Sequence, residues 1–459
     1  MAHPLPPTQS VRPHHHNDPS AVPGSRSASS STSQPTDLQS NLDELAAPPP
    51  VYDTSEKPMR QHDYLENHHS QNDRNTLHQA QDSIPDPDLV DTPRKTGNPL
   101  LLKIPRLTYT IGYLIFFSFA GTILRLAIEC LTFYPGSPVN TSVLWANVGG
   151  SLIMGFLSED QELFRTDESN DRQSATKHKK TIPLFIGLST GFCGSLTSFS
   201  TFIRDVFLAL SNDLPVPLGS YQNASLFSSV PAGASAPNGG FSFMALVAVL
   251  FTEIGLSLFG LILGAHLAIG TSAWMPTLSQ RWIRKIVDPT VFFLAISTWI
   301  TVICLAAALS KGSTKVTLWS TEMWRGPALF ALVFAPLGTL LRFFVSLKLN
   351  GRIASFPLGT FVVNVGGTMV LGMAYSLQHA SVSGASFAGC QVLQGIMDGF
   401  CGCLTTVSTW VLELSSLRKR HAYLYAVMSV AVALCALVVE IGSLKWTKGL
   451  VTPSCFIGS

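Results

Sequence analysis

The chain has 459 residues, of which 46% are hydrophobic and only 13% are charged, and its formal net charge at pH 7 is +2. A net charge this close to zero does not point to nucleic acid as a partner. The sequence has no Walker loop, no nucleophile elbow and no His-Glu-x-x-His motif, so we expect a protein that is not an enzyme.

The first part of the chain, residues 1–106, is rich in Pro, Ser, Asn, Asp and His and has few large apolar residues. Such a segment cannot bury enough apolar surface to offset the entropy of ordering, and we predict a disordered cytoplasmic tail. It has no basic start followed by an apolar core, so it does not resemble a signal peptide. The run His14-His15-His16 is interpreted as part of this polar tail, not as a metal site.

Long apolar stretches dominate the chain from Leu107 onward. A helix needs roughly 20 apolar residues to cross the hydrocarbon core of a bilayer. Nine stretches approach this length: 110–132, 141–158, 182–210, 241–269, 289–309, 327–347, 356–377, 389–414 and 423–444. Nine such runs with mostly short polar connections indicate an all-α integral membrane protein.

Lys and Arg residues gather in alternate connections, as they do on the cytoplasmic side of membrane proteins. They precede the stretches that begin at 110, 182, 289 and 423, and they follow the one that ends at 347. The connection 133–140 has no charged residue. We therefore predict a plasma-membrane protein with a cytoplasmic N-terminus and an extracellular C-terminus. In this arrangement the glycosylation sequons at Asn140 and Asn223 lie outside the cell, and the use of Asn223 stays open.

Three motifs occur twice, in the same order and at nearly constant separation. They are Gly-Thr-x-x-Arg at 121–125 and 338–342, Asn-Val-Gly-Gly at 147–150 and 364–367, and Gly-Phe-Cys-Gly-x-Leu-Thr at 191–197 and 399–405. The chain is therefore predicted to be a duplicated four-span unit.

The stretch 289–309 lies between the two halves and repeats neither of them. One extra span reverses the orientation of the second half, so we predict two inverted homologous four-helix halves joined by a single linker transmembrane helix. Inverted repeats commonly form a substrate pathway at their interface. The expected parts are the tail 1–106, a first four-span domain 107–270, a cytoplasmic loop with the linker span 271–312, and a second, inverted domain 313–459.

The order of these motifs, above all the segment from Gly191 to Phe202, resembles the Fluc (CrcB) fluoride channels. The whole arrangement is similar to the fused two-domain fluoride exporters of fungi, and the resemblance covers about residues 107–446. It implies a passive, fluoride-selective channel in the lipid bilayer that exports fluoride from the cytoplasm and gives fluoride resistance. It also implies a monomer that acts as a pseudo-dimer.

The resemblance places Phe199, Phe202, Asn147 and Asn364 at the fluoride pore. The two phenylalanines share one helical face, and the positive edge of an aromatic ring can face an anion. A side-chain amide offers two N–H donors to a partly dehydrated anion. From spacing alone, ordinary packing is the favoured explanation of the phenylalanines, and interhelical hydrogen bonds explain the asparagines equally well.

The second half departs from the pattern, because Val407 and Trp410 stand where the first half has Phe199 and Phe202. The residues that would touch the ion therefore differ between the halves. We predict one working pore and one degenerate pore, with Val407 and Trp410 in the degenerate one.

The resemblance also implies a structural sodium ion held by backbone oxygens of Gly194, Thr197, Gly402 and Thr405. Hard cations favour oxygen ligands, which suits a break in a helix where carbonyls are free. The alternative from the residues themselves is close helix packing through small side chains.

No other cofactor and no transition-metal site is expected, because Cys401-Gly-Cys403 is too short a cluster for zinc. The eight cysteines are scattered and mostly lie in apolar runs. They are interpreted as small buried residues, not as a disulfide framework.

Arg125 and Arg342 lie within predicted spans, where a charge is expensive and is by default functional or paired. We predict a structural role for both, packed against carboxylates or carbonyls. The acids Glu253 and Glu440 have no assigned role. They keep an alternative function open, that of a proton-coupled anion secondary transporter.

Overall fold

The computed structural model of the chain describes residues 99–132, 134, 137, 139, 141–164, 179–214, 239–311, 325–380, 387–451 and 453. Within these residues the regular structure is entirely helical. All of them belong to one compact unit, Leu38–Ser459. Most of the predicted tail, its histidine run and both sequons lie outside the described residues.

The first repeat begins with two uninterrupted helices, α2 (Pro99–Thr132) and α3 (Leu144–Glu159). A broken helix follows, made of α5 (Pro183–Ile186), η1 (Gly187–Cys193), α6 (Gly194–Leu196) and α7 (Phe199–Leu210). The long helix α8 (Gly239–Thr271) completes this repeat. The short elements η3 (Ser272–Trp274), α9 (Gln280–Trp282) and η4 (Ile283–Val287) lead into α10 (Asp288–Lys311).

The second repeat follows the same order. It starts with α11 (Arg325–Leu349), the turn η5 (Asn350–Arg352) and α12 (Leu358–His379). Its broken helix is made of α13 (Phe387–Gly395), η6 (Ile396–Cys401), α14 (Gly402–Leu404) and α15 (Ser408–Ser416). It closes with α16 (Lys419–Leu437), η7 (Val438–Gly442) and α17 (Ser443–Lys448).

Seven helical stretches in the described residues are long and apolar enough to cross a membrane, judged by length and composition. They are Arg106–Thr132, Gly239–Trp274, Gln280–Ala308, Pro327–Arg352, Leu358–His379, Ala388–Ser416 and Lys419–Lys448. The sequence predicts nine spans, and the predicted spans 141–158 and 182–210 are not among these seven. Helix α3, in the first of them, has only 16 residues.

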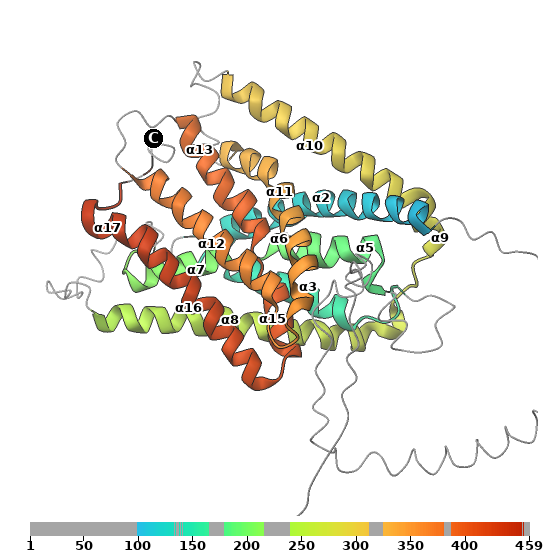
Figure 1. Cartoon of the computed structure of the whole chain (residues 1–459), viewed down its shortest axis with the longest axis horizontal. Helices are drawn as coiled ribbons and strands as arrows, with labels where there is room; N and C mark the ends of the chain where they lie inside the picture. Colours follow the sequence, from blue (N-terminus) through green and yellow to red (C-terminus); the bar gives the residue numbers. More distant parts are fainter. Residues whose placement is uncertain are drawn as a thin grey trace, which may run out of the picture. The chain divides into compact units, whose positions relative to one another are not determined.

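The two repeats pack against each other along their broken helices. In each repeat the first helix packs on the π-type turns of its own broken helix, α2 on η1 and α11 on η6. Between the repeats, α2 contacts α11, α7 contacts α12, and α15 contacts α3. Helix α10 lies alongside α2 and α11 at the margin of the bundle (Figure 1).

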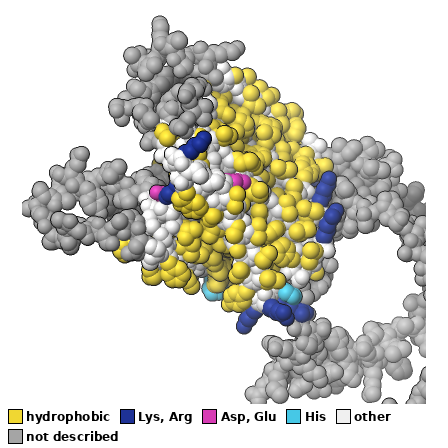
Figure 2. All heavy atoms as spheres, turned by 60° about the vertical axis from the view of Figure 1, so that its left-hand side comes forward, with side chains coloured by type: hydrophobic (Ala, Val, Ile, Leu, Met, Phe, Trp, Pro, Cys, Tyr) yellow, Lys and Arg dark blue, Asp and Glu magenta, His cyan; other side chains and the backbone are white. Residues whose placement is uncertain are grey.

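A broad apolar surface covers the side of the bundle shown in Figure 2, with Lys and Arg side chains gathered at its margins. Large hydrophobic side chains on α8 and α10 point outward, and Phe251 is 77% exposed and Phe293 70% exposed. A continuous apolar surface of this kind is unstable in water and matches a lipid environment. The chain is therefore an integral membrane protein of α-helices.

The cysteines differ in part from the prediction. Cys193, Cys401 and Cys403 are buried as expected, but Cys130, Cys304 and Cys435 are exposed, as befits small apolar residues on lipid-facing helices. Cys390 is disulfide-bonded, so the interpretation of the cysteines as small buried residues without disulfides was wrong for this residue.

Candidate functional site

Each broken helix is interrupted just after its third motif. In the first repeat, Thr197 (φ −96°, ψ 148°) and Ser198 (φ −140°, ψ 113°) are extended between α6 and α7. In the second, Thr405 (φ −93°, ψ 154°) is extended after α14. Extended residues inside a helix leave backbone groups without helical partners, and such backbone is tolerated at membrane depth only when it is buried in protein or lines a cavity.

The hydroxyl of Thr197 binds the opposite break. Its Oγ1 accepts hydrogen bonds from the backbone N–H groups of Val407 and Ser408, both at 3.2 Å. It also donates to the carbonyl of Cys193 at 3.0 Å. One buried side chain therefore satisfies backbone donors of the other repeat at its break.

Thr405 makes the matching contacts in the other direction. Its Oγ1 accepts the N–H of Ser200 at 3.0 Å and donates to the carbonyl of Cys401 at 2.9 Å. Ser198 and Ser200 lie within 3.4 Å and 3.0 Å of the same oxygen. The two breaks thus cross at a cluster of hydroxyl groups, each repeat completing the hydrogen bonds of the other.

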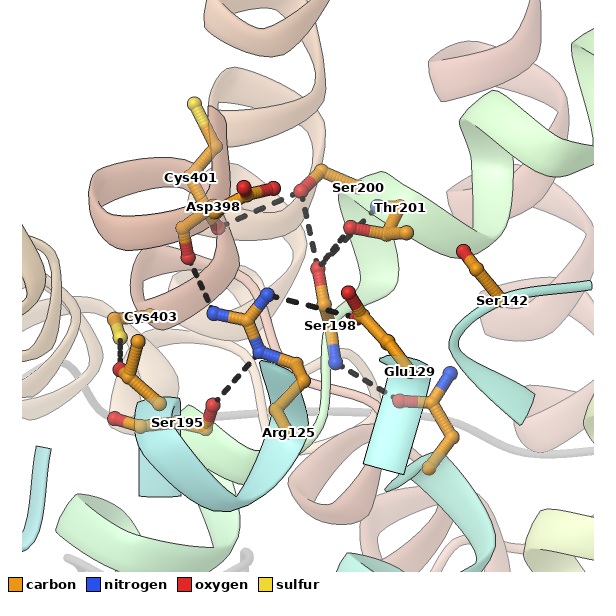
Figure 3. A network of polar contacts seen from close by, with 12 residues as sticks. Arg125, Glu129, Ser142, Ser195, Ser198, Ser200, Thr201, Asp398, Cys401 and Cys403 are labelled. Carbon is orange, nitrogen blue, oxygen red and sulfur yellow. Dashed lines mark hydrogen bonds and ion pairs between the residues drawn. The ribbon is translucent and has the colours of Figure 1, made fainter. Parts of the chain in front are cut away.

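Two arginines flank this crossing. Arg125 Nε donates to the Ser195 carbonyl at 3.1 Å, and its Nη2 donates to the carbonyl of Asp398 in the other repeat. Its Nη1 lies 3.9 Å from the Glu129 carboxylate one helical turn away, and Figure 3 shows the guanidinium between these three groups. Arg125 is fully buried.

Arg342 occupies the corresponding place in the second repeat. Its Nη1 donates to the carbonyls of Gly194 at 2.7 Å and Thr405 at 3.3 Å, and its Nη2 donates to the carbonyl of Thr190 at 2.6 Å. Both arginines therefore use their charge on backbone oxygens within and just after the π-type turns of the broken helices.

Glycine is required where these arginines approach the opposite broken helix. A Cβ built on Gly194 would lie 2.3 Å from Arg342 Nη2, and one on Gly402 would lie 2.4 Å from Arg125 Nη2. A Cβ at either position would therefore displace the guanidinium from its present place, where it is bonded to backbone carbonyls.

The side chains of Asn147 and Asn364 accept hydrogen bonds from backbone N–H groups at the two breaks. Asn147 Oδ1 accepts the N–H of Ser198 and Asn364 Oδ1 accepts the N–H of Thr406, both at 2.9 Å. Their amide nitrogens differ, because Asn147 Nδ2 donates to the Glu253 carboxylate at 3.1 Å and Asn364 Nδ2 donates to the Thr406 carbonyl at 3.1 Å. Both side chains are fully buried.

The aromatic side chains form one buried cluster beside the crossing. The rings of Phe199 and Phe202 meet edge to face with centroids 5.7 Å apart. Phe199 also meets Trp410 of the other repeat, with centroids 5.3 Å apart. The structure thus brings together both predicted pore phenylalanines and Trp410, and Val407 is buried in the same hydrophobic core.

Two of the four residues predicted to hold a sodium ion contact Arg342 at this crossing. The carbonyls of Gly194 and Thr405, two of the four predicted ligands, converge on Arg342 Nη1. Carbonyl oxygens from both repeats therefore converge on the positive charge of Arg342. A sodium ion at these oxygens would share them with the guanidinium of Arg342.

The hydrogen bond between Glu253 and Asn147 was not predicted from the sequence. This acid is 1% exposed on α8 and bonds Asn147, while its Oε1 has no hydrogen-bond partner among the described residues. The hydroxyls of Ser151 and Ser257 are also buried without a partner there. These groups lie on α3 and α8, which pack against each other. Thr252, on the same helix, is exposed.

The two acids that follow the third motif support the surrounding helices. Asp205 accepts from the backbone N–H of Ser142 at 3.3 Å and pairs with Arg204 at 3.0 Å. Glu413 accepts from the hydroxyls of Thr360 at 2.6 Å and Tyr425 at 2.8 Å. Both acids orient neighbouring groups, and no pattern in the sequence identified these partners.

Comparison with known proteins shows a family match in both repeats. The family described as CrcB-like protein, Camphor Resistance (CrcB), matches residues 113–241 and 329–442. Two matches to one family, one in each half, agree with the repeated motifs. No solved structure matches the chain.

Curated relatives cover most of the chain. Fluoride export protein 1 of Neurospora crassa is 47% identical over 392 residues, which are 77% of this chain and 70% of the relative. Fluoride export protein 1 of Candida albicans is 32% identical over 338 residues, 72% of this chain and 78% of the relative. A bacterial protein, the fluoride-specific ion channel FluC of Acinetobacter baylyi, is 36% identical over 104 residues, 22% of this chain and 75% of the relative.

Proposed function

The chain belongs to the family of CrcB-like proteins, and from this premise we propose that it is a passive, fluoride-selective channel that exports fluoride from the cytoplasm. The relatives that cover most of the chain are named fluoride export proteins, and a bacterial relative is named a fluoride-specific ion channel. The observation that carries the proposal is the buried aromatic cluster of Phe199, Phe202 and Trp410 beside two crossed helix breaks.

The chemistry of this region suits a small anion. The edge of an aromatic ring carries partial positive charge and can face an anion in a dry passage. The amide nitrogen of Asn147 carries two N–H groups, and the carboxylate of Glu253 takes one of them. The pore that we propose runs past Phe199 and Phe202 with Asn147 and Asn364 as donors, and the side with Val407 and Trp410 is degenerate.

No energy source beyond the membrane potential is needed. A potential that is negative inside favours the exit of one anion by about 2.3 kcal/mol per 100 mV. A selective pore then suffices to expel fluoride that has entered the cell as the neutral acid. Export of this kind gives fluoride resistance, and proton coupling through Glu253 or Glu440 is not favoured.

We also propose the arrangement in the membrane. The interrupted helix α5–α7 and the short helix α3 join the seven long stretches to make nine spans, with α10 as a linker that inverts the second half. Reciprocal contacts of Thr197 with Ser408 and of Thr405 with Ser200 support a two-fold relation between the halves. A single chain then acts as a pseudo-dimer, with the domain limits that the sequence predicts.

The charges of the connections support an orientation in the plasma membrane with the N-terminus in the cytoplasm. Arg281, Arg284 and Lys285 precede α10, and Arg418, Lys419 and Arg420 stand at the start of α16. In the nine-span arrangement these groups lie on one side of the membrane, and cytoplasmic connections carry such an excess. The C-terminus is then extracellular.

A structural sodium ion at the crossing is part of the proposal. Its ligands would be backbone oxygens of Gly194, Thr197, Gly402 and Thr405, and the convergence of two of these on Arg342 supports a site for positive charge. When bound, the ion would supply fixed positive charge at the contact between the repeats.

The test is fluoride efflux from liposomes that contain the purified protein, read with a fluoride electrode while a potassium ionophore sets the voltage. We expect fast, voltage-driven loss of fluoride, no loss of chloride, and strongly reduced fluoride loss with Phe199→Ile. Phe293→Ile on the exposed face of α10 is the matched control and should leave efflux unchanged. Saturable efflux that follows a proton gradient instead of the voltage would establish the coupled transporter.

A further inference from the structure

Exposed cations stand beside exposed apolar side chains in the segment that leads into α10. Arg281, Arg284 and Lys285 are exposed there. Trp282 is 55% exposed and Ile286 is 53% exposed, and the two lie four residues apart, close to one helical turn. We propose that this segment and the start of α16 bind the headgroups of anionic phospholipids.

One side of the segment is held against the protein. Ile283 is buried, and shortly before it the N–H of Leu278 donates to the Leu163 carbonyl at 3.1 Å. Directly after the segment, α10 carries outward side chains such as Phe293 into the lipid-facing surface. Figure 2 shows Lys and Arg side chains at the margins of such an apolar surface. Trp282 therefore lies at the edge of the surface that meets lipid, with the cations beside it.

The start of α16 has the same combination of side chains. Lys419 and Arg420 are exposed, and Tyr423 and Leu424, which follow them, are also exposed. The next residue, Tyr425, is fully buried. The register of α16 therefore directs one tyrosine into the protein and the other, one turn after the cations, toward the surroundings.

The acids nearest to these cations in the sequence are buried and bonded within the protein. Asp288 is buried and accepts the hydroxyl of Tyr113 at 2.8 Å. Glu413 is fully buried and accepts the hydroxyls of Thr360 at 2.6 Å and Tyr425 at 2.8 Å. The exposed charge of both segments is therefore positive, and it complements a negatively charged headgroup.

The far end of the stretch that begins with α16 uses its cations differently. Lys445 donates to the Ser211 carbonyl at 2.9 Å and pairs with the carboxylate of Asp213. Its charge thus joins α17 to the end of α7. Lys448 is exposed there next to this paired lysine, whereas Lys419 and Arg420 are exposed side by side.

Phospholipid headgroups match this pattern of side chains. A guanidinium binds phosphate through two parallel N–H···O bonds, and a lysine adds a compact charge. Trp and Tyr are enriched at the level of the headgroups, where their rings meet both lipid and water. Clusters of Lys and Arg beside a membrane helix attract anionic lipids, which lie in the cytoplasmic leaflet. This agrees with the orientation proposed above and does not depend on fluoride transport.

Native mass spectrometry of the full chain in detergent tests the proposal. Phosphatidylserine and phosphatidylcholine with the same acyl chains are added at equal concentrations, and the lipid bound to the folded protein is counted. We expect phosphatidylserine to be retained about tenfold more strongly, because each cation near the headgroup adds to its binding. Equal retention of the two lipids would overturn the proposal. Inorganic phosphate should leave phosphatidylserine bound, and complete displacement by it would show a site for free phosphate instead.

Variants that remove charge locate the bound lipid. They are R281Q/R284Q/K285Q before α10, K419Q/R420Q at the start of α16, and the control K448Q. The first two should each retain less phosphatidylserine, with an unchanged melting temperature because the replaced side chains are exposed. Lys448→Gln should retain as much as the unmodified chain. Retention that is the same in all three variants, or that falls as far in the control, would contradict the proposed sites.

Trp282→Ala separates a lipid from its charge alone, because it keeps every cation of the segment. It should lower the retention of phosphatidylserine, since the ring packs against the apolar part of the lipid. Trp446→Ala removes an exposed ring beside Lys448 and should leave retention unchanged. Full retention in folded Trp282→Ala protein would overturn the assignment of the bound group as a lipid.

Discussion

Asn147 donates a hydrogen bond of 3.1 Å to the carboxylate of Glu253, although the two residues lie on different helices and both are fully or almost fully buried. The matching Asn364 has no acid and donates to the Thr406 carbonyl instead. The repeats are therefore asymmetric at the asparagines as well as at the aromatic positions. Such asymmetry is expected of a duplicated chain in which one pathway conducts.

This pair leads to the first prediction. Glu253→Ala leaves the buried amide of Asn147 without its acceptor, which costs about 1–3 kcal/mol of stability. Glu253→Gln keeps an acceptor oxygen and should be clearly milder. Glu440→Ala is the control, because the buried Oε2 of Glu440 has no hydrogen-bond partner among the described residues. Thermal unfolding in detergent measures all three, and equal losses for the alanine and glutamine variants at 253 would contradict the role of the hydrogen bond.

The same variants separate a channel from a coupled transporter. Glutamine cannot take up and release a proton, so proton coupling through Glu253 would be lost in Glu253→Gln. A passive channel should keep its voltage-driven fluoride efflux in this variant and show the same flux with and without a proton gradient. Efflux that disappears from folded Glu253→Gln protein would favour coupling.

Trp410 carries the next prediction. Its indole nitrogen is buried without a hydrogen-bond partner in the described part of the chain, while its ring packs against Phe199. Trp410→Phe keeps an aromatic ring and removes an unsatisfied donor, so it should cost less than about 1.5 kcal/mol. Trp410→Ala opens a cavity beside Phe199 and should cost about 3–5 kcal/mol. Similar melting temperatures for the two variants would show that Trp410 does not support the cluster.

The repeated motifs predicted the elements of the fold because membrane helices are set by long apolar runs and by small residues at close contacts. Phe199 and Phe202 could be singled out from a motif within a single segment. Sequence alone could not predict the hydrogen bonds between Thr197 and Val407 and between Asn147 and Glu253. Each joins residues that are far apart in the sequence, and their register depends on the assembled bundle.

The glycines of the third motif give a sharp test of the arginine contacts. Gly194→Ala and Gly402→Ala would push a Cβ into the guanidinium groups of Arg342 and Arg125. Each should displace an arginine from its carbonyls and cost several kcal/mol, since breaking a buried charged contact costs about 3–5 kcal/mol. Gly149→Ala and Gly366→Ala are the controls, because nothing lies within 4 Å of a Cβ at either position. Alanine there should be neutral or stabilise its helix by about 0.5–1 kcal/mol.

Ion substitution tests the sodium site, because backbone carbonyls cannot be removed by mutation. A ligand at about 100 times its Kd that binds only the folded protein adds about 2.7 kcal/mol of stability. We therefore expect a higher melting temperature in sodium chloride than in potassium chloride or N-methylglucamine chloride at equal ionic strength. Equal melting temperatures in all three would mean that no sodium ion binds. The guanidinium of Arg342, which donates hydrogen bonds to the Gly194 and Thr405 carbonyls, would then be the cation that joins the two repeats.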